Sequence, residues 1–302
     1  MSELSRTLST LTTEAANPAW ADIDTWPTPR LVSEMIAADA GLYAAVDACA
    51  DAISAAVDGI VARLQRGGRL VYVGAGTAGR MGVLDASEIP PTFGTDPSLV
   101  VGVIAGGEKA VRQAVENAED DSRGGAQAIA DLDVGEADTV VGIASSGRTP
   151  YVLGALEEAG RRSALLIGLT NNAGSPVGAA ADIAIEVVVG PEFIAGSTRL
   201  RSGTSQKLVL NLLSTCAMVR LGKTYGNLMV DLRATNEKLR VRSVRTVVAA
   251  TGVSESEAAA ALASADGAVK TAILMVLARV DAAEARTRLD AADGHLREAL
   301  SS

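Results

Sequence analysis

The feature that most constrains the fold is an alternation of short apolar runs with amphipathic segments of helical period. Five runs are rich in β-branched residues, whereas the segments between them repeat apolar residues every three or four positions. The runs lie at residues 69–76, 99–107, 138–147, 164–171 and 183–189. Continuous apolar strands that alternate with helices indicate a parallel sheet covered on both faces. The sequence therefore predicts an α/β fold with a doubly wound, mainly parallel five-stranded sheet.

The segments around this sheet differ from it in composition. Residues 1–30 are polar and rich in proline, which predicts an extended arm that wraps on another surface. Residues 31–64 are Ala-rich with helical spacing and predict one or two long helices, and residues 198–222 predict a long, largely buried helix. Residues 244–302 contain no β-rich run, so a separate bundle of three to five helices is expected there.

Charge and composition exclude several classes of partner and site. With 27 Lys and Arg against 36 Asp and Glu, the net charge of −9 argues against nucleic acid or an anionic membrane as partner. The sequence has one histidine, His295, near its C-terminal end, so a Ser-His-Asp triad or a metal site with several histidines is not expected. Cys49 and Cys216 lie in apolar surroundings and predict two reduced, buried thiols. No leader or membrane-spanning run is recognisable, so a cytoplasmic protein is expected.

The first apolar run ends in a glycine-rich loop that begins a predicted helix. Gly74, Gly76 and Gly79 fit the G-x-G-x-x-G pattern of dinucleotide sites. The acid that would hold a ribose hydroxyl is missing after the next strand, so nucleotide binding is a minor alternative. The loop instead predicts a small anion site, in which backbone N–H groups and the Thr77 hydroxyl face the ligand at a helix N-terminus.

A second polar loop follows the third run and directly precedes a helix. Its residues are Ser145, Ser146, Gly147, Arg148 and Thr149. Hydroxyl and N–H groups at a helix start suit a phosphate monoester, whose oxygens accept several short hydrogen bonds. Ordinary N-capping would explain one hydroxyl but not the whole loop, so phosphate binding is favoured over capping.

Two groups of acids are candidates for catalysis. Glu88 lies near the end of the first helix; if Pro90 and Pro91 end that helix after about Ser87, the macrodipole and apolar neighbours disfavour a charged carboxylate, as suits a general acid. A solvated surface glutamate is an equal alternative. The second group lies on the helix expected after the second strand and is ordinarily a solvated face. Its members are Glu116, Glu119, Asp120 and Asp121. Glu116 and Glu119 would share one side of that helix, and spacing does not choose between them.

These blocks resemble the N-acetylmuramic acid 6-phosphate etherases, bacterial enzymes with a sugar-isomerase-type (SIS) domain. The matching pieces are GAGTAGRMGVLDASEIPPTFG, VIAGGEKAVRQAVENAED, VVGIASSGRTPYV, GTSQKLVLNLLST and YGNLMVDLRATNEKLRVR, and they cover nearly the whole chain. The resemblance implies removal of the D-lactyl ether by β-elimination and water addition, without metal or organic cofactor, during cell-wall recycling. The chain is expected to divide into three parts: an N-terminal arm with helices that pack on the core (1–60), the SIS-type sugar-phosphate-binding catalytic domain (61–235) and a helical domain (236–302).

The resemblance also implies roles for individual residues. The family's acid in "DASE" falls on Glu88, expected to protonate the departing lactyl oxygen, and its second acid falls on Glu119, expected to remove the C2 proton. Thr77, Ser146 and Thr149 would hold the 6-phosphate, with Ser145 and Arg148 nearby. Ala78 stands where the family often has Ser, so one hydrogen bond to the ligand is expected to be missing.

Two further segments match the family. Lys207 and the TNEKLR run, with Asn236, Glu237 and Lys238, could reach a site across a subunit boundary, and an exposed capped helix is an equal alternative for both. Because SIS domains commonly pair, a homodimer with active sites near the interface is expected.

Two other functions share the fold. A sugar-phosphate-sensing regulator like the glucokinase regulatory proteins needs the phosphate loops but no acid at position 88, so "DASE" favours the enzyme. An aldose–ketose isomerase often uses His or Lys, and the single histidine lies in the helical tail.

Overall fold

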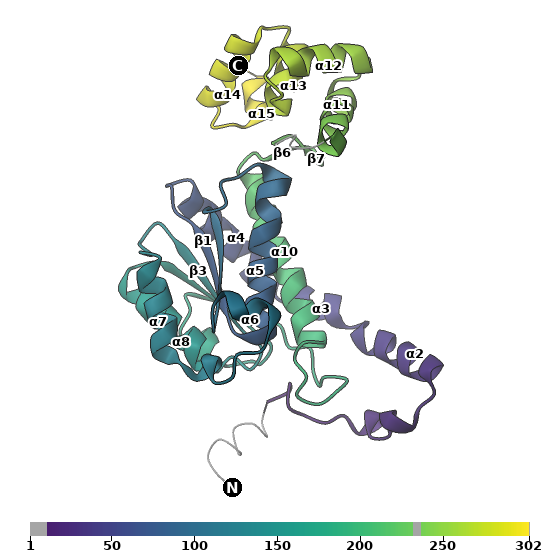
Figure 1. The fold of residues 1–302 in the computed structure, drawn as a ribbon, viewed down its shortest axis with the longest axis vertical. Helices are drawn as coiled ribbons and strands as arrows, with labels where there is room; N and C mark the ends of the chain where they lie inside the picture. Colours follow the sequence, from purple (N-terminus) through teal and green to yellow (C-terminus); the bar gives the residue numbers. More distant parts are fainter. Residues whose placement is uncertain (1–10, 232–236, 302) are drawn as a thin grey trace. The chain divides into compact units, whose positions relative to one another are not determined.

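A computed structural model describes residues 11–231 and 237–301 and confirms the predicted α/β fold. Five parallel strands form one sheet in the order β2-β1-β3-β4-β5. Figure 1 labels two of these strands, the neighbours β1 and β3. The strands are β1 (Leu70–Gly74), β2 (Val100–Ile104), β3 (Thr139–Ala144), β4 (Leu165–Thr170) and β5 (Ile183–Glu186). Each coincides with a predicted apolar run, and the three central strands are buried along their whole length because helices cover both faces.

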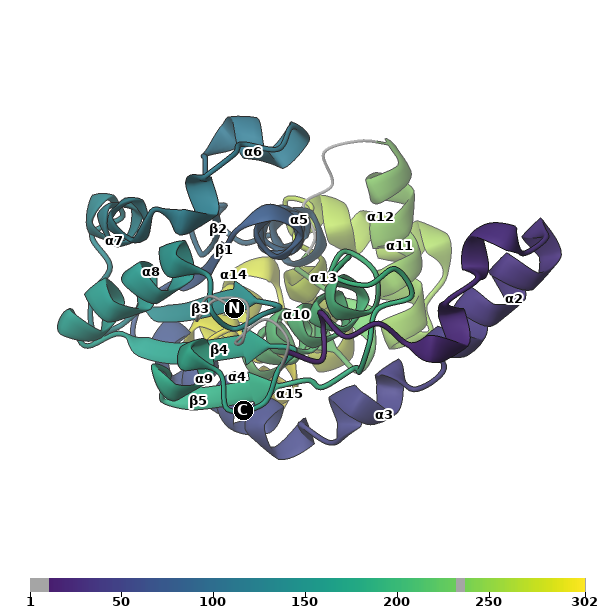
Figure 2. The same ribbon diagram turned by 90° about the horizontal axis from the view of Figure 1, so that it is seen from below.

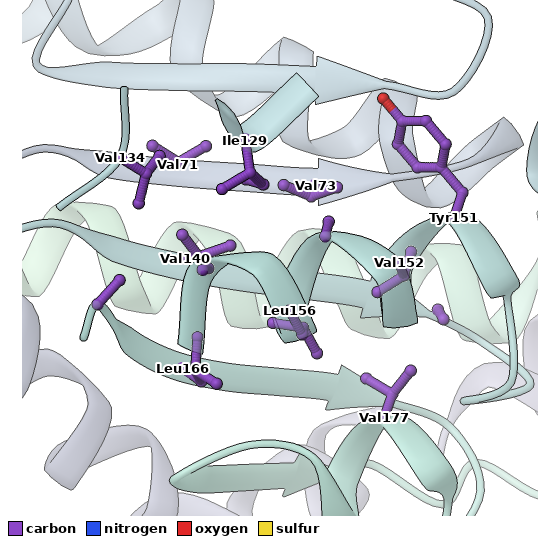
Figure 3. Packing of buried hydrophobic residues seen from close by; sticks show 14 of the residues in the cluster. Val71, Val73, Ile129, Val134, Val140, Tyr151, Val152, Leu156, Leu166 and Val177 are labelled. Atoms are coloured by element: carbon purple, nitrogen blue, oxygen red, sulfur yellow. The ribbon is translucent and has the colours of Figure 1, made fainter. Parts of the chain in front are cut away.

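Three helices pack on each face of the sheet. One face carries α7 (Ser122–Asp131), α8 (Pro150–Arg161) and α9 (Pro176–Ala179), and the other carries α4 (Ala50–Leu64), α5 (Gly76–Phe93) and α10 (Arg201–Arg220). Figure 2 shows α7 and α8 on the opposite side of the strands from α5 and α10. On the first face, alternate residues of neighbouring strands meet α8: Val71, Val73 and Val140 pack against Val152 and Leu156 (Figure 3).

The N-terminal part corrects two expectations. Residues 11–30, the part of the predicted arm that the structure describes, are not simply extended, because prolines start helices there: Pro18 opens a 3₁₀ turn (Pro18–Trp20), and α2 (Thr28–Asp39) follows Pro27. The Ala-rich segment forms three helices, α2, α3 (Leu42–Asp47) and α4, rather than one or two. Cys49 is half-buried and Cys216 is exposed, so the prediction of two buried thiols holds for neither side chain; both thiols are free.

The chain divides into two compact units, Met1–Ala86 with Ser98–Ser214 and Ser87–Pro97 with Thr215–Ser302. The second unit is helical, as expected, with an additional hairpin that was not predicted. Its elements are β6 (Thr224–Tyr225), β7 (Leu228–Met229), α11 (Glu237–Thr251), α12 (Glu255–Ser264), α13 (Val269–Ala278), α14 (Ala282–Ala291) and α15 (Leu296–Ala299). The predicted capping box is present at the start of α12, where Ser254 and Glu257 bond reciprocally.

No single helix in the described part of the chain is long and apolar enough to span a membrane. One pair, α12 with α13, passes the same criteria by length and composition alone and is bent by 113°.

Candidate functional site

The two predicted phosphate loops lie next to each other at the carboxyl edge of the sheet. Strands β1 and β3 are parallel neighbours, with Gly74 in register with Ile143. The chain leaves β1 toward β2 on one side and returns to β3 on the other, which makes this the switch point where such sheets bind ligands. The loops that begin α5 and α8 therefore lie side by side at this edge of the sheet.

The glycines of the first loop let the helix approach the strand. A Cβ on Gly74 would lie 2.6 Å from the backbone nitrogen of Gly79, and one on Gly79 would lie 2.7 Å from the carbonyl oxygen of Gly74. Gly76 has a φ of 53°, in the left-handed region. Thr77 is half-buried at the start of α5, and Ala78 is buried. Close packing and turn geometry thus account for all three glycines without a nucleotide.

The second loop does not cap its helix in the ordinary way. Thr149 occupies the N-cap position of α8, but its side chain makes no capping hydrogen bond. Ser146 Oγ accepts a hydrogen bond from the Arg148 backbone nitrogen at 3.2 Å. Gly147 has a φ of 67°, and a Cβ there would lie 2.3 Å from Ser175 Cβ. N-capping, the alternative to phosphate binding, therefore does not explain the Thr149 hydroxyl.

A polar network that the sequence did not reveal lies behind this loop. Gln206 Nε2, on α10, donates to Ser145 Oγ at 2.8 Å and to Asn171 Oδ1 at 2.9 Å. Asn171 Nδ2 donates to the carbonyl oxygen of Val187 at 2.9 Å. Asn171 and Gln206 are fully buried. The sequence signal that could have indicated this network is the pair Asn171 and Asn172, which directly follows β4 at the carboxyl edge of the sheet.

The start of the described chain is fastened to the same loop. Asn172 Nδ2 donates to the carbonyl oxygen of Ser145 at 2.9 Å and to Thr13 Oγ1 at 3.1 Å. Asn172 Oδ1 accepts from the backbone nitrogen and the hydroxyl of Thr12, at 2.8 and 2.9 Å. Thr12 and Thr13 are thus connected through Asn172 to the loop of residues 145–149, which we call the serine loop.

Lys207 is engaged by an acid on the neighbouring helix. Its Nζ lies 3.0 Å from Oδ1 of Asp85, whose Oδ2 accepts from the Tyr72 hydroxyl at 3.1 Å. Burial, with the Asp85 carboxylate beside it, raises the pKa of Tyr72 well above its ordinary value. Asp85 follows Thr77 by two turns of α5, about 12 Å along the axis. This separation places the Lys207 ammonium away from the phosphate loops.

Glu119 lies in a short segment that packs on α8. The helix expected after β2 is broken into α6 (Glu108–Arg112), a 3₁₀ turn (Ala118–Asp120) and α7, because Gln113 is extended and Asn117 adopts a left-handed conformation with a φ of 62°. Glu116 and Glu119 therefore do not share one helix face, and both are exposed. Asp121 caps α7 by accepting from the Gly124 nitrogen at 2.8 Å. The 3₁₀ turn contacts α8, which begins at the serine loop.

Glu88 is exposed in α5, and the expected helix end is wrong. The helix continues through Pro90 and Pro91 to Phe93, and the Gly94 nitrogen donates to the carbonyl oxygen of Pro90 at 2.9 Å. Proline's fixed φ is helical, so two prolines in the last turn remove hydrogen bonds without ending the helix. Glu88 thus lies before the last turn, in the second compact unit, with its carbonyl oxygen accepting from Thr92 Oγ1 at 2.8 Å.

Lys238 is exposed near the start of α11 in the second unit. It lines an open groove of about 780 Å³ together with Glu237, Arg242 and Arg245. Asn236, of the same predicted run, lies outside the described residues. Over residues 11–231 and 237–301, no group of three or more His, Cys, Asp or Glu side chains could hold a metal ion.

Comparisons with known proteins agree with this architecture. Residues 52–160 match the glucokinase regulatory protein N-terminal SIS domain, and residues 124–215 match the SIS domain. A solved structure of a candidate phosphosugar isomerase from Bacteroides fragilis is 21% identical, with a TM-score of 0.50 over 64% of this chain and 91% of that one. This likeness concerns the fold alone.

Relatives that match along nearly the whole chain share one name. The chain is 57% identical to an N-acetylmuramic acid 6-phosphate etherase of Streptomyces avermitilis, over 98% of this chain and 95% of the relative. It is 54% identical to the protein of that name from Streptomyces coelicolor, over 99% and 96%. For the Aliivibrio fischeri protein of that name the identity is 51%, over 97% and 98%.

Proposed function

The chain belongs to the N-acetylmuramic acid 6-phosphate etherase family, and we propose that Glu88 and Glu119 carry out the proton transfers of its reaction. The protein is a carbon–oxygen lyase that cleaves the D-lactyl ether of N-acetylmuramic acid 6-phosphate, giving N-acetylglucosamine 6-phosphate and D-lactate in peptidoglycan recycling. The observation that carries this function is identity above 50% to etherases over almost the full chain. The relatives' name does not favour a non-catalytic regulator.

The 6-phosphate is bound by the loops at the β1–β3 switch point. Gly76 and Thr77 supply one side, and the serine loop, residues 145–149, supplies the other. Three features support this proposal: the loops adjoin, each precedes a helix N-terminus, and the Thr149 hydroxyl is not used for capping. A phosphate oxygen accepts hydrogen bonds only, so hydroxyl and N–H donors suit it.

The elimination needs one base and one acid. With the sugar ring open, the C1 aldehyde acidifies the C2 proton, which passes to Glu119 and leaves an enolate before the C3–O bond breaks. Glu88 gives a proton to the departing lactyl oxygen, leaving a C2–C3 double bond conjugated to the aldehyde. Water then adds at C3, guided by Glu88, and a proton returns to C2. Contact between the 3₁₀ turn that carries Glu119 and α8 supports the base assignment.

The remaining contacts and the assembly are also proposals. Lys238 contacts the anionic substrate, supported by the cationic Arg242 and Arg245 in its groove. Lys207, held by Asp85 away from the phosphate loops, contacts a part of the substrate other than its phosphate. A homodimer with active sites near its interface is supported by α2, in which no residue is buried and Val32, Met35 and Ile36 are exposed. Two free thiols fit a cytoplasmic location.

Incubation with N-acetylmuramic acid 6-phosphate in deuterated water tests the function and both roles. Wild-type protein should release D-lactate and incorporate deuterium at C2. Folded protein that releases no D-lactate would refute the etherase function. Glu88→Gln should still exchange the C2 proton while releasing lactate about 10²–10⁴-fold more slowly. Glu119→Gln should lose both processes.

Glu116→Gln is the matched control for these variants. It changes an exposed carboxylate three residues from Glu119 and should retain lactate release close to that of the wild type. Full lactate release by Glu88→Gln would refute its role as acid, and C2 exchange at the wild-type rate in Glu119→Gln would refute the base.

A further inference from the structure

We propose that Asn171 and Gln206 are positioning residues that fix the hydroxyl of Ser145 as a hydrogen-bond donor to the substrate phosphate. The inference rests on the proposed function, because it concerns the same phosphate loops. It assigns a task to two fully buried amides that the proposed reaction does not use.

The orientation of Asn171 is set by a group that can only accept. The carbonyl oxygen of Val187 lies 2.9 Å from Asn171 Nδ2, and a carbonyl cannot donate, so the nitrogen end of the amide must face it. The second Nδ2 hydrogen goes to Ser205 Oγ at 2.9 Å. Ser205 in turn donates its own proton to the carbonyl oxygen of Ser202 at 2.8 Å. The Oδ1 end of Asn171 is therefore left to accept from Gln206.

This acceptor decides the orientation of Gln206. Its Nε2 lies 2.9 Å from Asn171 Oδ1, so the nitrogen end faces Asn171, and its other hydrogen goes to Ser145 Oγ at 2.8 Å. The Oε1 atom is buried and has no hydrogen-bond partner. Leaving a buried carbonyl unpaired is unfavourable, so stability alone does not explain this arrangement. A flipped amide would place two carbonyl oxygens against each other and would take up the Ser145 proton.

The Ser145 hydroxyl oxygen consequently accepts a hydrogen bond from Gln206, and the hydroxyl proton remains available for another acceptor. A hydroxyl has one proton, and the bond from Gln206 uses a lone pair of the oxygen rather than that proton. The Ser145 carbonyl oxygen is also held, by the Asn171 backbone nitrogen at 3.0 Å and Asn172 Nδ2 at 2.9 Å. Ser145 is half-buried at the edge of the loop. A fixed loop with a free hydroxyl proton is what an acceptor-only phosphate requires.

A double-mutant cycle separates positioning from a general structural effect. KM and kcat for N-acetylmuramic acid 6-phosphate are measured for Ser145→Ala, Gln206→Met and the double variant, with Gln65→Met, an exposed glutamine, as control. Each single variant should raise KM about tenfold or more, with a much smaller change in kcat. The double variant should resemble Ser145→Ala, because Gln206 acts through that hydroxyl. Gln65→Met should match the wild type.

Each outcome points one way. If Gln206→Met raises KM by the same factor with or without Ser145, the positioning role is overturned. If wild-type protein releases no lactate, the etherase function fails instead, which keeps the two failures distinct.

A second measurement covers a Gln206→Met variant that does not fold. The side-chain amide resonances of Gln206 in wild-type protein should shift when inorganic phosphate is added, whereas those of Gln65 should not. Identical shifts for both glutamines, or none for Gln206 at saturating phosphate, would overturn the inference.

Discussion

The crossing of α7 and α8 depends on glycine, and Gly154→Ala should disrupt it. A Cβ on Gly154 would lie 2.0 Å from the carbonyl oxygen of Ser122. Carbon and carbonyl oxygen ordinarily approach to about 3.3 Å, so the helices would have to separate by roughly 1.3 Å. The obstructing atom belongs to the backbone, and no side-chain rotation can relieve the contact.

The expected effect has a stability part and a catalytic part. Because the obstructing atom cannot move aside, the overpacking cost should lie at the upper end of its range, about 3 kcal/mol, and the better helix propensity of alanine offsets about 1 kcal/mol, which leaves a net loss of about 2 kcal/mol. The 3₁₀ turn that carries Glu119 lies directly before α7 and contacts α8. A displacement of the proposed base by about 1 Å should lower kcat/KM about 100-fold.

Gly160→Ala is the matched control in the same helix. A Cβ on Gly160 would lie 3.3 Å from Leu166 Cδ1, the end of a side chain that can move, so stability should not fall and should rise by up to about 1 kcal/mol from the better helix propensity of alanine. Urea unfolding and lactate release are measured for both variants. Equal unfolding midpoints would refute the backbone contact, and a destabilised Gly154→Ala protein with full kcat/KM would refute its link to Glu119.

Two further predictions concern the sheet and the helical unit. Because the pKa of Tyr72 is raised in the folded protein, only the unfolded chain ionises this group just above about pH 10, and the free energy of unfolding then falls by up to about 1.4 kcal/mol per pH unit. Tyr72→Phe should make alkaline unfolding less steep and exposed Tyr43→Phe should not; equal steepness in both would contradict this. Ser254→Ala removes the capping box of α12 and should cost about 1 kcal/mol in thermal unfolding, whereas no change would show that the cap does not support the helix.

The sheet could be predicted because its strands are apolar along their whole length, a pattern that depends only on neighbouring residues. The same reasoning failed where individual residues decided the backbone conformation. Extended Gln113 and left-handed Asn117 interrupt the helix that was expected to carry Glu116 and Glu119, whereas Pro90 and Pro91 are tolerated in the last turn of α5. The β6–β7 hairpin was missed although Gly226, with a φ of 57°, is a turn signal.

The candidate loops could be proposed from hydroxyl and glycine spacing before helices. Their support could not, because it joins residues that are distant in sequence. Ser145 and Gln206 are 61 positions apart, and nothing in the sequence near either residue indicates that they meet. Donor and acceptor assignments of this kind follow only from positions in space.

The hydrogen bonds from Thr12 to Asn172 can form only after both residues have been synthesised, which sets when this part of the site is completed. The partners are separated by 160 positions, so the start of the chain must wait for its partner to be synthesised. At about 5–20 residues per second, that interval is on the order of 10–30 s. The serine loop therefore acquires this fastening only after Asn172 has been made, when Thr12 and Thr13 return to the end of the fourth strand.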